Sequence, residues 1–177
     1  MSKNLNVIMT IAKIVRLVTK IFFIISIVAG SISLLGAITL WAEFPSLNID
    51  GTKVVLNIFD TGDIPTKDAA VKCLIEAIIC ASNAVILGFS STYFKNMITD
   101  GTPFTSRGAN ELLRLGILAS AIPVVCQIIC EICATLLASS DLAVGTHEAN
   151  VIVGLVLIFT SFLLRHGAEI EGKENIS

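Results

Sequence analysis

Charged residues are what this sequence has least of. Only 15% of its 177 residues are Asp, Glu, Lys or Arg, whereas soluble domains usually carry about a quarter. Hydrophobic residues make up 54% of the chain. This composition argues against a water-soluble protein, and no segment outside the apolar runs is long enough to build a separate catalytic domain with its own core.

Sequence signatures of catalysis are absent as well. There are two histidines, His147 and His166, one on each side of the last apolar run. The chain has no glycine-rich phosphate loop, no nucleophile elbow and no His-Glu-x-x-His motif. It also has no basic patch suited to nucleic acid. We therefore expect a non-enzymatic protein that uses no cofactor and does not bind nucleic acid directly.

Cysteine is missing from every loop. A disulfide framework would place cysteines in the oxidising loops, but all five lie inside apolar runs, which predicts reduced, buried thiols: Cys73, Cys80, Cys126, Cys130 and Cys133. A metal site of thiols and carboxylates is the alternative. One helix cannot close three sulfurs around a tetrahedral zinc ion, so we expect no metal.

Four long apolar runs are the main feature that the sequence does contain. They cover about residues 21–41, 73–94, 115–138 and 151–164, the last starting a few residues earlier. A helix needs roughly 20 apolar residues to cross a bilayer core about 30 Å thick. The runs predict an all-α membrane protein, a four-transmembrane-helix bundle forming one domain over residues 1–177. The expected spans are about 17–41, 71–94, 112–138 and 144–165.

The basic residues predict the orientation of these spans. Nine of the 12 lie before the first apolar run, between the second and third runs, or after the fourth run, and three lie on the other side. The positive-inside rule then places both termini, the loop 95–111 and the tail 166–177 in the cytoplasm of a multi-pass protein of the cell membrane. We interpret the N-terminal run as an uncleaved anchor, because it is too long for a signal peptide and no small-residue cleavage site follows Trp41.

The outer loop 42–70 contains a strand pattern. Residues 46–59 alternate between apolar and polar around Asp50-Gly51, a strong two-residue turn signal. This predicts a small β-hairpin in the first extracytoplasmic loop.

Local signals predict helix packing and helix starts. Ser26, Gly30, Ser33 and Ala37 share one face of the first span, and small residues at this spacing let helix backbones approach closely in lipid. The second helix should begin just after Pro65. In the loop before the third span, Thr105 or Ser106 is expected to cap a helix.

Four polar side chains within the spans are candidate site residues: Glu76, Asn83, Gln127 and Glu131. Ionisable groups inside a membrane are costly and usually face the bundle interior or a cavity, so Glu76 and Glu131 suggest a cation or proton site. The structural alternative pairs Glu76 with Lys72 and hydrogen-bonds Glu131 to Gln127.

Two stretches carry a resemblance to a known family. Gly101-Thr-Pro-Phe-Thr-Ser-Arg-Gly-Ala-Asn-Glu-Leu-Leu-Arg-Leu-Gly116 and Arg165-His-Gly-Ala-Glu-Ile-Glu171 resemble the Pro-Phe-Thr loop and the C-terminal end of a bacterial family of small four-span membrane proteins of unknown function (YoaS-like). The resemblance implies the same four-span fold. It also implies a cytosolic partner such as a small helix-turn-helix regulator, whose gene often neighbours the family's.

These observations lead to two hypotheses. In the first, the protein recruits or regulates a cytosolic partner through Pro103, Phe104, Thr105, Arg107, Arg114, Arg165 and Glu169, although Pro103 and Phe104 could simply seat the loop on the bundle. In the second, it is a small transporter, ion-binding component or immunity-type membrane protein that uses Glu76 and Glu131. The lipid bilayer is the partner expected in both, and a homo-oligomer is the way to make room for a substrate pathway.

Overall fold

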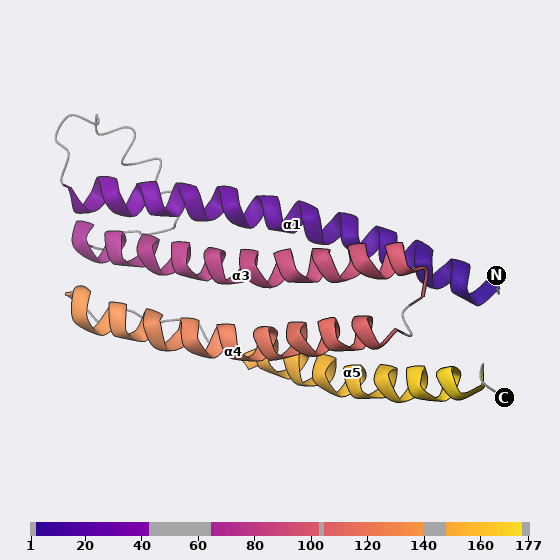
Figure 1. Ribbon diagram of the computed structural model, residues 1–177. Helices are drawn as coiled ribbons and strands as arrows, with labels where there is room; N and C mark the ends of the chain where they lie inside the picture. Colours follow the sequence, from indigo (N-terminus) through magenta and orange to yellow (C-terminus); the bar gives the residue numbers. More distant parts are fainter. Residues whose placement is uncertain (1–2, 43–64, 103–104, 140–147, 175–177) are drawn as a thin grey trace. The chain divides into compact units, whose positions relative to one another are not determined.

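The computed structural model describes residues 3–42, 65–102, 105–139 and 148–174, and within them the regular structure is α-helical (Figure 1). Four helices follow one another along the chain: α1 (Lys3–Trp41), α3 (Thr66–Asp100), α4 (Ser106–Leu137) and α5 (Glu148–Glu174). The prediction of an all-helical membrane fold is confirmed at this level. The predicted hairpin of residues 46–59 lies outside the described residues and stays a prediction.

Three of the helices are long and apolar enough to cross a membrane. The qualifying stretches are Val7–Trp41, Thr66–Asp100 and Arg107–Leu137. The apolar part of α5, Ile152–Gly167, is shorter; at 1.5 Å per residue it is about 24 Å long, against a bilayer core of about 30 Å. The described residues therefore support three spans directly, and the fourth predicted span only in part.

Many of the side chains exposed along these helices are hydrophobic, as expected for residues that face lipid. Large hydrophobic residues lie on the surface of every helix, among them Leu17, Leu35, Leu136 and Phe159, each more than 60% exposed. A soluble protein would not expose so much contiguous apolar surface. Hydroxyl groups inside the helices bond back to the carbonyls three or four residues earlier, as Ser33 does to Ala29 at 2.9 Å, so they need no water.

The helices contribute to two compact units. Unit 2 comprises Ile25–Asn83 and Val125–Thr146. In it, Ala37 and Leu40 of α1 pack against Ala69, Ala70 and Cys73 of α3. A Cβ added at Gly30 would lie 3.1 Å from the Cβ of Cys80, and Ser33 is 1% exposed. The small-residue face of the first span therefore packs against α3, as its spacing predicts.

The other side of α3 in unit 2 contacts α4. Val71 and Ile75 of α3 form a buried cluster with Cys126, Cys130 and Ala134 of α4. All five cysteines of the chain are free thiols, in agreement with the prediction of reduced cysteines. Three of them are buried and fill the space between helices as small apolar residues, Cys73 between α1 and α3 and Cys126 and Cys130 between α3 and α4. Cys80 and Cys133 are half-buried, so the predicted burial is confirmed for three of the five.

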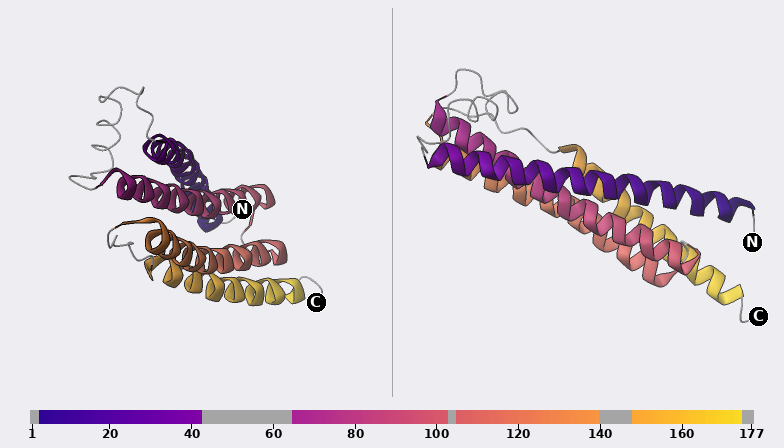
Figure 2. Two further views of the ribbon diagram at one scale, coloured as in Figure 1. Left: turned by 90° about the vertical axis from the view of Figure 1, so that its left-hand side faces the viewer. Right: turned by 90° about the horizontal axis from the view of Figure 1, so that it is seen from above.

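Unit 1 comprises Met1–Ile24, Ala84–Val124 and His147–Ser177. In it, α3 contacts α1 near Phe23 and Gly88, and it contacts α4 through a cluster of Tyr93, Leu112 and Leu115. Within this unit α4 lies between α3 and α5 (Figure 2). The helix α5 continues to Glu174, so most of the segment predicted as a polar tail, residues 166–177, is helical.

Candidate functional site

The connection between α3 and α4 is shaped by a glycine and a helix cap. Gly101 follows the last residue of α3 with φ of +71°, a left-handed conformation that glycine adopts without steric cost. The Thr105 Oγ1 accepts a hydrogen bond from the Gly108 N–H at 2.9 Å, which satisfies one of the orphan donors at the start of α4. This confirms the predicted cap at Thr105.

Glu111 holds the two helices together beside this connection. The Asn96 Nδ2 on α3 donates to both carboxylate oxygens of Glu111 on α4, at 2.9 and 3.0 Å. The Arg107 Nε donates to Glu111 Oε1 at 3.1 Å. The side chain of Glu111 is 25% exposed and that of Arg107 is 68% exposed. We call Asn96, Arg107 and Glu111 with the Thr105 cap the α3–α4 corner.

A hydrophobic cluster next to the corner brings in α5. Tyr93, Leu112 and Leu115 are 7%, 5% and 5% exposed, and Leu164 of α5 packs against them. Arg165 follows Leu164 directly and is exposed. The end of the apolar part of α5 therefore lies beside the first turns of α4.

The closest approach of α4 and α5 is a crossing of two glycines. A Cβ built at Gly116 would lie 2.7 Å from Ile158 Cγ1 and 3.0 Å from the carbonyl oxygen of Gly154. A Cβ built at Gly154 would lie 2.8 Å from the carbonyl oxygen of Gly116 and would overlap Ser120. Only glycine fits at these two positions. The sequence interpretation missed this crossing, although the Gly116-x-x-x-Ser120 spacing is a signal of close packing.

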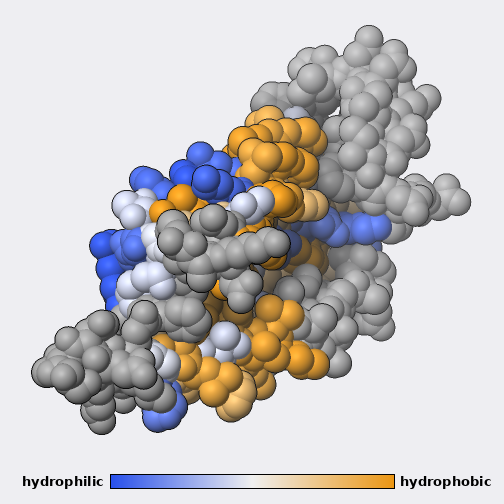
Figure 3. All heavy atoms as spheres, turned by 90° about the vertical axis from the view of Figure 1, so that its right-hand side faces the viewer, coloured by the Kyte–Doolittle hydropathy of each residue, from blue (hydrophilic) through white to orange (hydrophobic). Residues whose placement is uncertain are grey.

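The predicted docking residues have different positions. Pro103 and Phe104 lie outside the described residues. Thr105 caps α4, Arg107 and Arg114 are exposed on α4, and Arg165 is exposed on α5. Glu169 belongs to α5, but its side chain is outside the described part. Hydrophilic and hydrophobic side chains form separate patches on the face drawn in Figure 3.

Of the candidate intramembrane residues, Gln127 and Glu131 are bonded to each other. Gln127 Nε2 donates to Glu131 Oε1 at 2.8 Å, the hydrogen bond expected from their i,i+4 spacing, and the Glu131 side chain is exposed. Glu76 and Asn83 on α3 are half-buried. In the part of the chain that the structure describes, no group of three or more His, Cys, Asp or Glu side chains could hold a metal ion.

Asp68 is a structural anchor that the sequence interpretation missed. It lies in the first turn of α3, where a carboxylate is favoured by the helix dipole, and it is 0% exposed. Its Oδ1 accepts a hydrogen bond from the backbone N–H of Ser139, just after α4, at 2.6 Å. The start of this helix just after Pro65 was predicted, but no local pattern indicates a partner 71 residues away.

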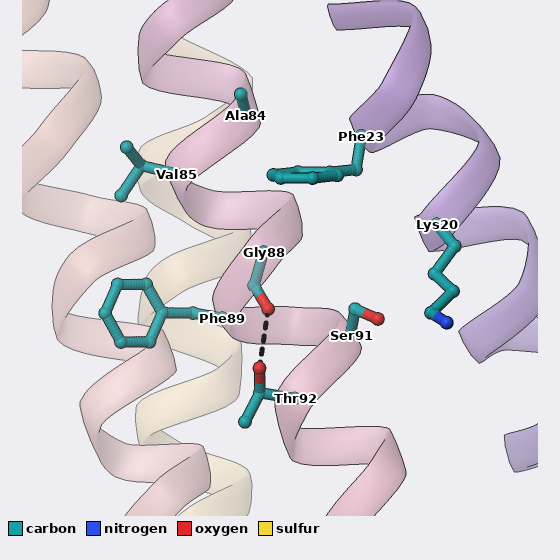
Figure 4. Close-up of a pocket in the computed structure, with 8 residues that line it drawn as sticks. All are labelled: Lys20, Phe23, Ala84, Val85, Gly88, Phe89, Ser91 and Thr92. Atoms are coloured by element: carbon teal, nitrogen blue, oxygen red, sulfur yellow. Dashed lines mark hydrogen bonds between the residues drawn. The ribbon is translucent and has the colours of Figure 1, made fainter. Parts of the chain in front are cut away.

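Two hollows lie on either side of the α3 segment that contains Phe89. One, of about 610 Å³, is lined by residues of α1 and α3 (Figure 4): Lys20, Phe23, Ala84, Val85, Gly88, Phe89, Ser91 and Thr92. The other, of about 440 Å³, is lined by residues of α3 and α4: Phe89, Thr92, Tyr93, Glu111, Arg114, Leu115, Ile117 and Leu118. Both belong to unit 1.

Comparison with known proteins identifies no relative of the chain. No family model, no curated protein and no solved structure matches the chain.

Proposed function

We propose that this protein is a non-enzymatic, multi-pass protein of the cell membrane that holds a cytosolic protein partner at the α3–α4 corner. The proposal includes the four-span topology with both termini in the cytoplasm, supported by the excess of basic residues on that side. The predicted hairpin between α1 and α3 would then face the outside. The resemblance to YoaS-like proteins makes a small helix-turn-helix regulator the first partner to test.

The observation that carries the proposal is the bonding of Glu111. Its carboxylate accepts hydrogen bonds from Asn96 and Arg107, which fixes the corner before any partner arrives. Fixing a surface in advance lowers the entropy lost on binding. Arg107 nevertheless remains 68% exposed, and arginine is among the residues enriched in protein–protein interfaces.

Helices that continue beyond the apolar runs enlarge the same surface. The helix α5 extends nine residues past Arg165, to Glu174, which at 1.5 Å per residue adds about 14 Å of helix. Because Leu164 packs against the cluster of Tyr93, Leu112 and Leu115, this extension begins next to the first turns of α4. A partner could therefore contact α4 and α5 together.

Site-specific crosslinking in intact cells tests this proposal. A photoreactive amino acid at Asn110, which is exposed and one turn from Arg107, should crosslink to one cytosolic protein. The same amino acid at Ile129, 43% exposed in the apolar part of α4, should not. Arg107→Gln should reduce the crosslink at least fivefold. Lys95→Gln, which removes an exposed charge from the end of α3 near the corner, is the matched control and should leave the yield unchanged.

Either of two results would contradict the proposal. If no cytosolic protein crosslinks at position 110, or if Arg107→Gln and Lys95→Gln have the same effect, the corner is not a docking surface.

The second candidate, a transporter or ion-binding component, is supported by the exposure of Glu131. A carboxyl group exposed on a membrane-spanning helix is costly unless it serves a purpose, and its hydrogen bond to Gln127 offsets only part of that cost. We rank it lower because Glu76 is half-buried elsewhere on α3. Proton flux into liposomes that contain the purified protein should be lost in Glu131→Gln; flux equal to that of the wild type would return Glu131 to a structural role.

A further inference from the structure

The two hollows lie on the two sides of Phe89 and adjoin each other along α3. They share Phe89 and Thr92, and one opens toward α1 and the other toward α4. Phe89 is 51% exposed, so its ring stands between the hollows as a ridge. We call the two hollows together the Phe89 groove. Their volumes, about 610 and 440 Å³, are in the range of small-molecule sites.

The walls of the groove are hydrocarbon. Phe23 of α1 extends toward α3 next to Gly88, and Val85 and Phe89 point the other way (Figure 4). The Thr92 hydroxyl is occupied, because it donates to the Gly88 carbonyl at 3.0 Å. The groove lies within the stretches of α1, α3 and α4 that are apolar enough to cross a membrane, so acyl chains are the molecules that surround it.

Each hollow also has one cation in its lining. Lys20 lines the hollow toward α1 and Arg114 lines the hollow toward α4, and both side chains are exposed. Long basic side chains reach along apolar surface and place their charge at the headgroup level. Glu111, the carboxylate among the lining residues, is already bonded to Asn96 and Arg107. The groove therefore combines apolar walls with an unbalanced positive charge.

We propose that the Phe89 groove binds one anionic phospholipid, with an acyl chain in each hollow, the Phe89 ring between the chains and the phosphate contacted by Lys20 and Arg114. Basic pockets between transmembrane helices bind anionic headgroups in this way. The inference deepens the proposed membrane location and needs no cytosolic partner. A second membrane protein is the competing occupant, but it would not require a cation on each side of the ridge.

Native mass spectrometry of the purified full chain in mild detergent tests the site. Phosphatidylglycerol and phosphatidylcholine with identical acyl chains are added separately, and bound lipids are counted. The wild-type protein should bind one phosphatidylglycerol more tightly than phosphatidylcholine. Each cation is expected to contribute about fivefold, so Lys20→Gln with Arg114→Gln should weaken phosphatidylglycerol binding about 25-fold. Far-UV circular dichroism checks that each variant keeps its helices.

A control with the same change of charge separates a site from general attraction. Lys13→Gln with Lys95→Gln removes two exposed basic residues that do not line the groove, and should leave binding unchanged. Gly88→Val tests the acyl-chain part, because a Cβ there lies 3.4 Å from the Phe23 ring and further carbons fill the hollow. This variant should weaken the binding of both lipids and keep their ratio.

Two outcomes would overturn the proposal. Equal affinity of the wild-type protein for the two lipids would show that the cations do not select a headgroup. Equal losses in the two double variants would show that surface charge, and not the groove, attracts the lipid. Because the protein is purified without a partner, neither outcome affects the docking proposal.

Discussion

The crossing of α4 and α5 at Gly116 and Gly154 can be tested with a single methyl group. Gly154→Ala adds a Cβ 2.7 Å from the Ser120 N and 2.8 Å from the Gly116 carbonyl oxygen, whereas ordinary contact begins at 3.4 Å. Two of the atoms in the way belong to the backbone of α4, so no rotamer change relieves the overlap. The helices must separate by about 0.6 Å along the crossing, which opens gaps at neighbouring contacts such as Ile158.

The expected magnitude follows from two opposing terms. Overpacking of this kind costs about 1–3 kcal/mol, and the replacement of glycine by alanine inside a helix returns about 1 kcal/mol. Gly88→Ala gains the same stabilisation of the helix without the overlap, because its Cβ would meet only the Phe23 ring, at 3.4 Å. We therefore expect Gly154→Ala to be about 2 kcal/mol less stable than Gly88→Ala.

The assay is reversible unfolding in mixed micelles, in which the fraction of dodecyl sulfate is raised and helix loss is followed by far-UV circular dichroism. Ser120→Ala combined with Gly154→Ala should not restore stability, because the Ser120 N and the Gly116 carbonyl oxygen remain in place. Equal stability of Gly154→Ala and Gly88→Ala would refute the reasoning, since it would mean that the two backbones do not meet at Gly154.

Four further outcomes are expected. Asp68→Ala should lower the free energy of unfolding by about 2 kcal/mol, because the N–H of Ser139 loses a charged acceptor. Asp68→Asn keeps an acceptor oxygen and should lower it less. Equal losses in the two variants would contradict the role of the Asp68 carboxylate as this acceptor. Asn96→Ala should cost about 1–2 kcal/mol, because it removes a bond to a carboxylate. Arg107→Gln, at an exposed ion pair, should cost less than about 1 kcal/mol in the same unfolding assay. A topology reporter fused to the C-terminal end should be active only in the cytoplasm, and one placed between α4 and α5 only outside; a cytoplasmic signal at both positions would contradict the fourth span.

Local sequence patterns predicted the parts of the structure that depend on helical geometry alone. Thr105 caps α4 because its hydroxyl reaches the N–H three residues on. Gln127 bonds Glu131 because residues four apart lie on the same helix face. The same reasoning identified the small-residue face of α1 around Gly30, since only small side chains let another backbone approach closely.

The rotation of each helix about its axis was not predictable. Glu76 and Glu131 were considered as one site because each lies within an apolar run. In the structure Cys130 faces α3 and is 1% exposed, and the next residue, Glu131, is exposed. A shift of one position turns a helical side chain by about 100°, and nothing in a uniformly apolar run reveals which face meets the neighbouring helix.

The sequence by itself determined that the chain forms long apolar helices and where α3 and α4 begin, because hydropathy and capping act over a few residues. Only the tertiary structure decided the contacts between distant segments: Asp68 with Ser139, Gly116 with Gly154, and Asn96 with Glu111. In lipid the hydrophobic effect does not select one apolar face over another. The pairing of helices therefore depends on shape and on a few polar contacts, which become visible only when the helices are packed.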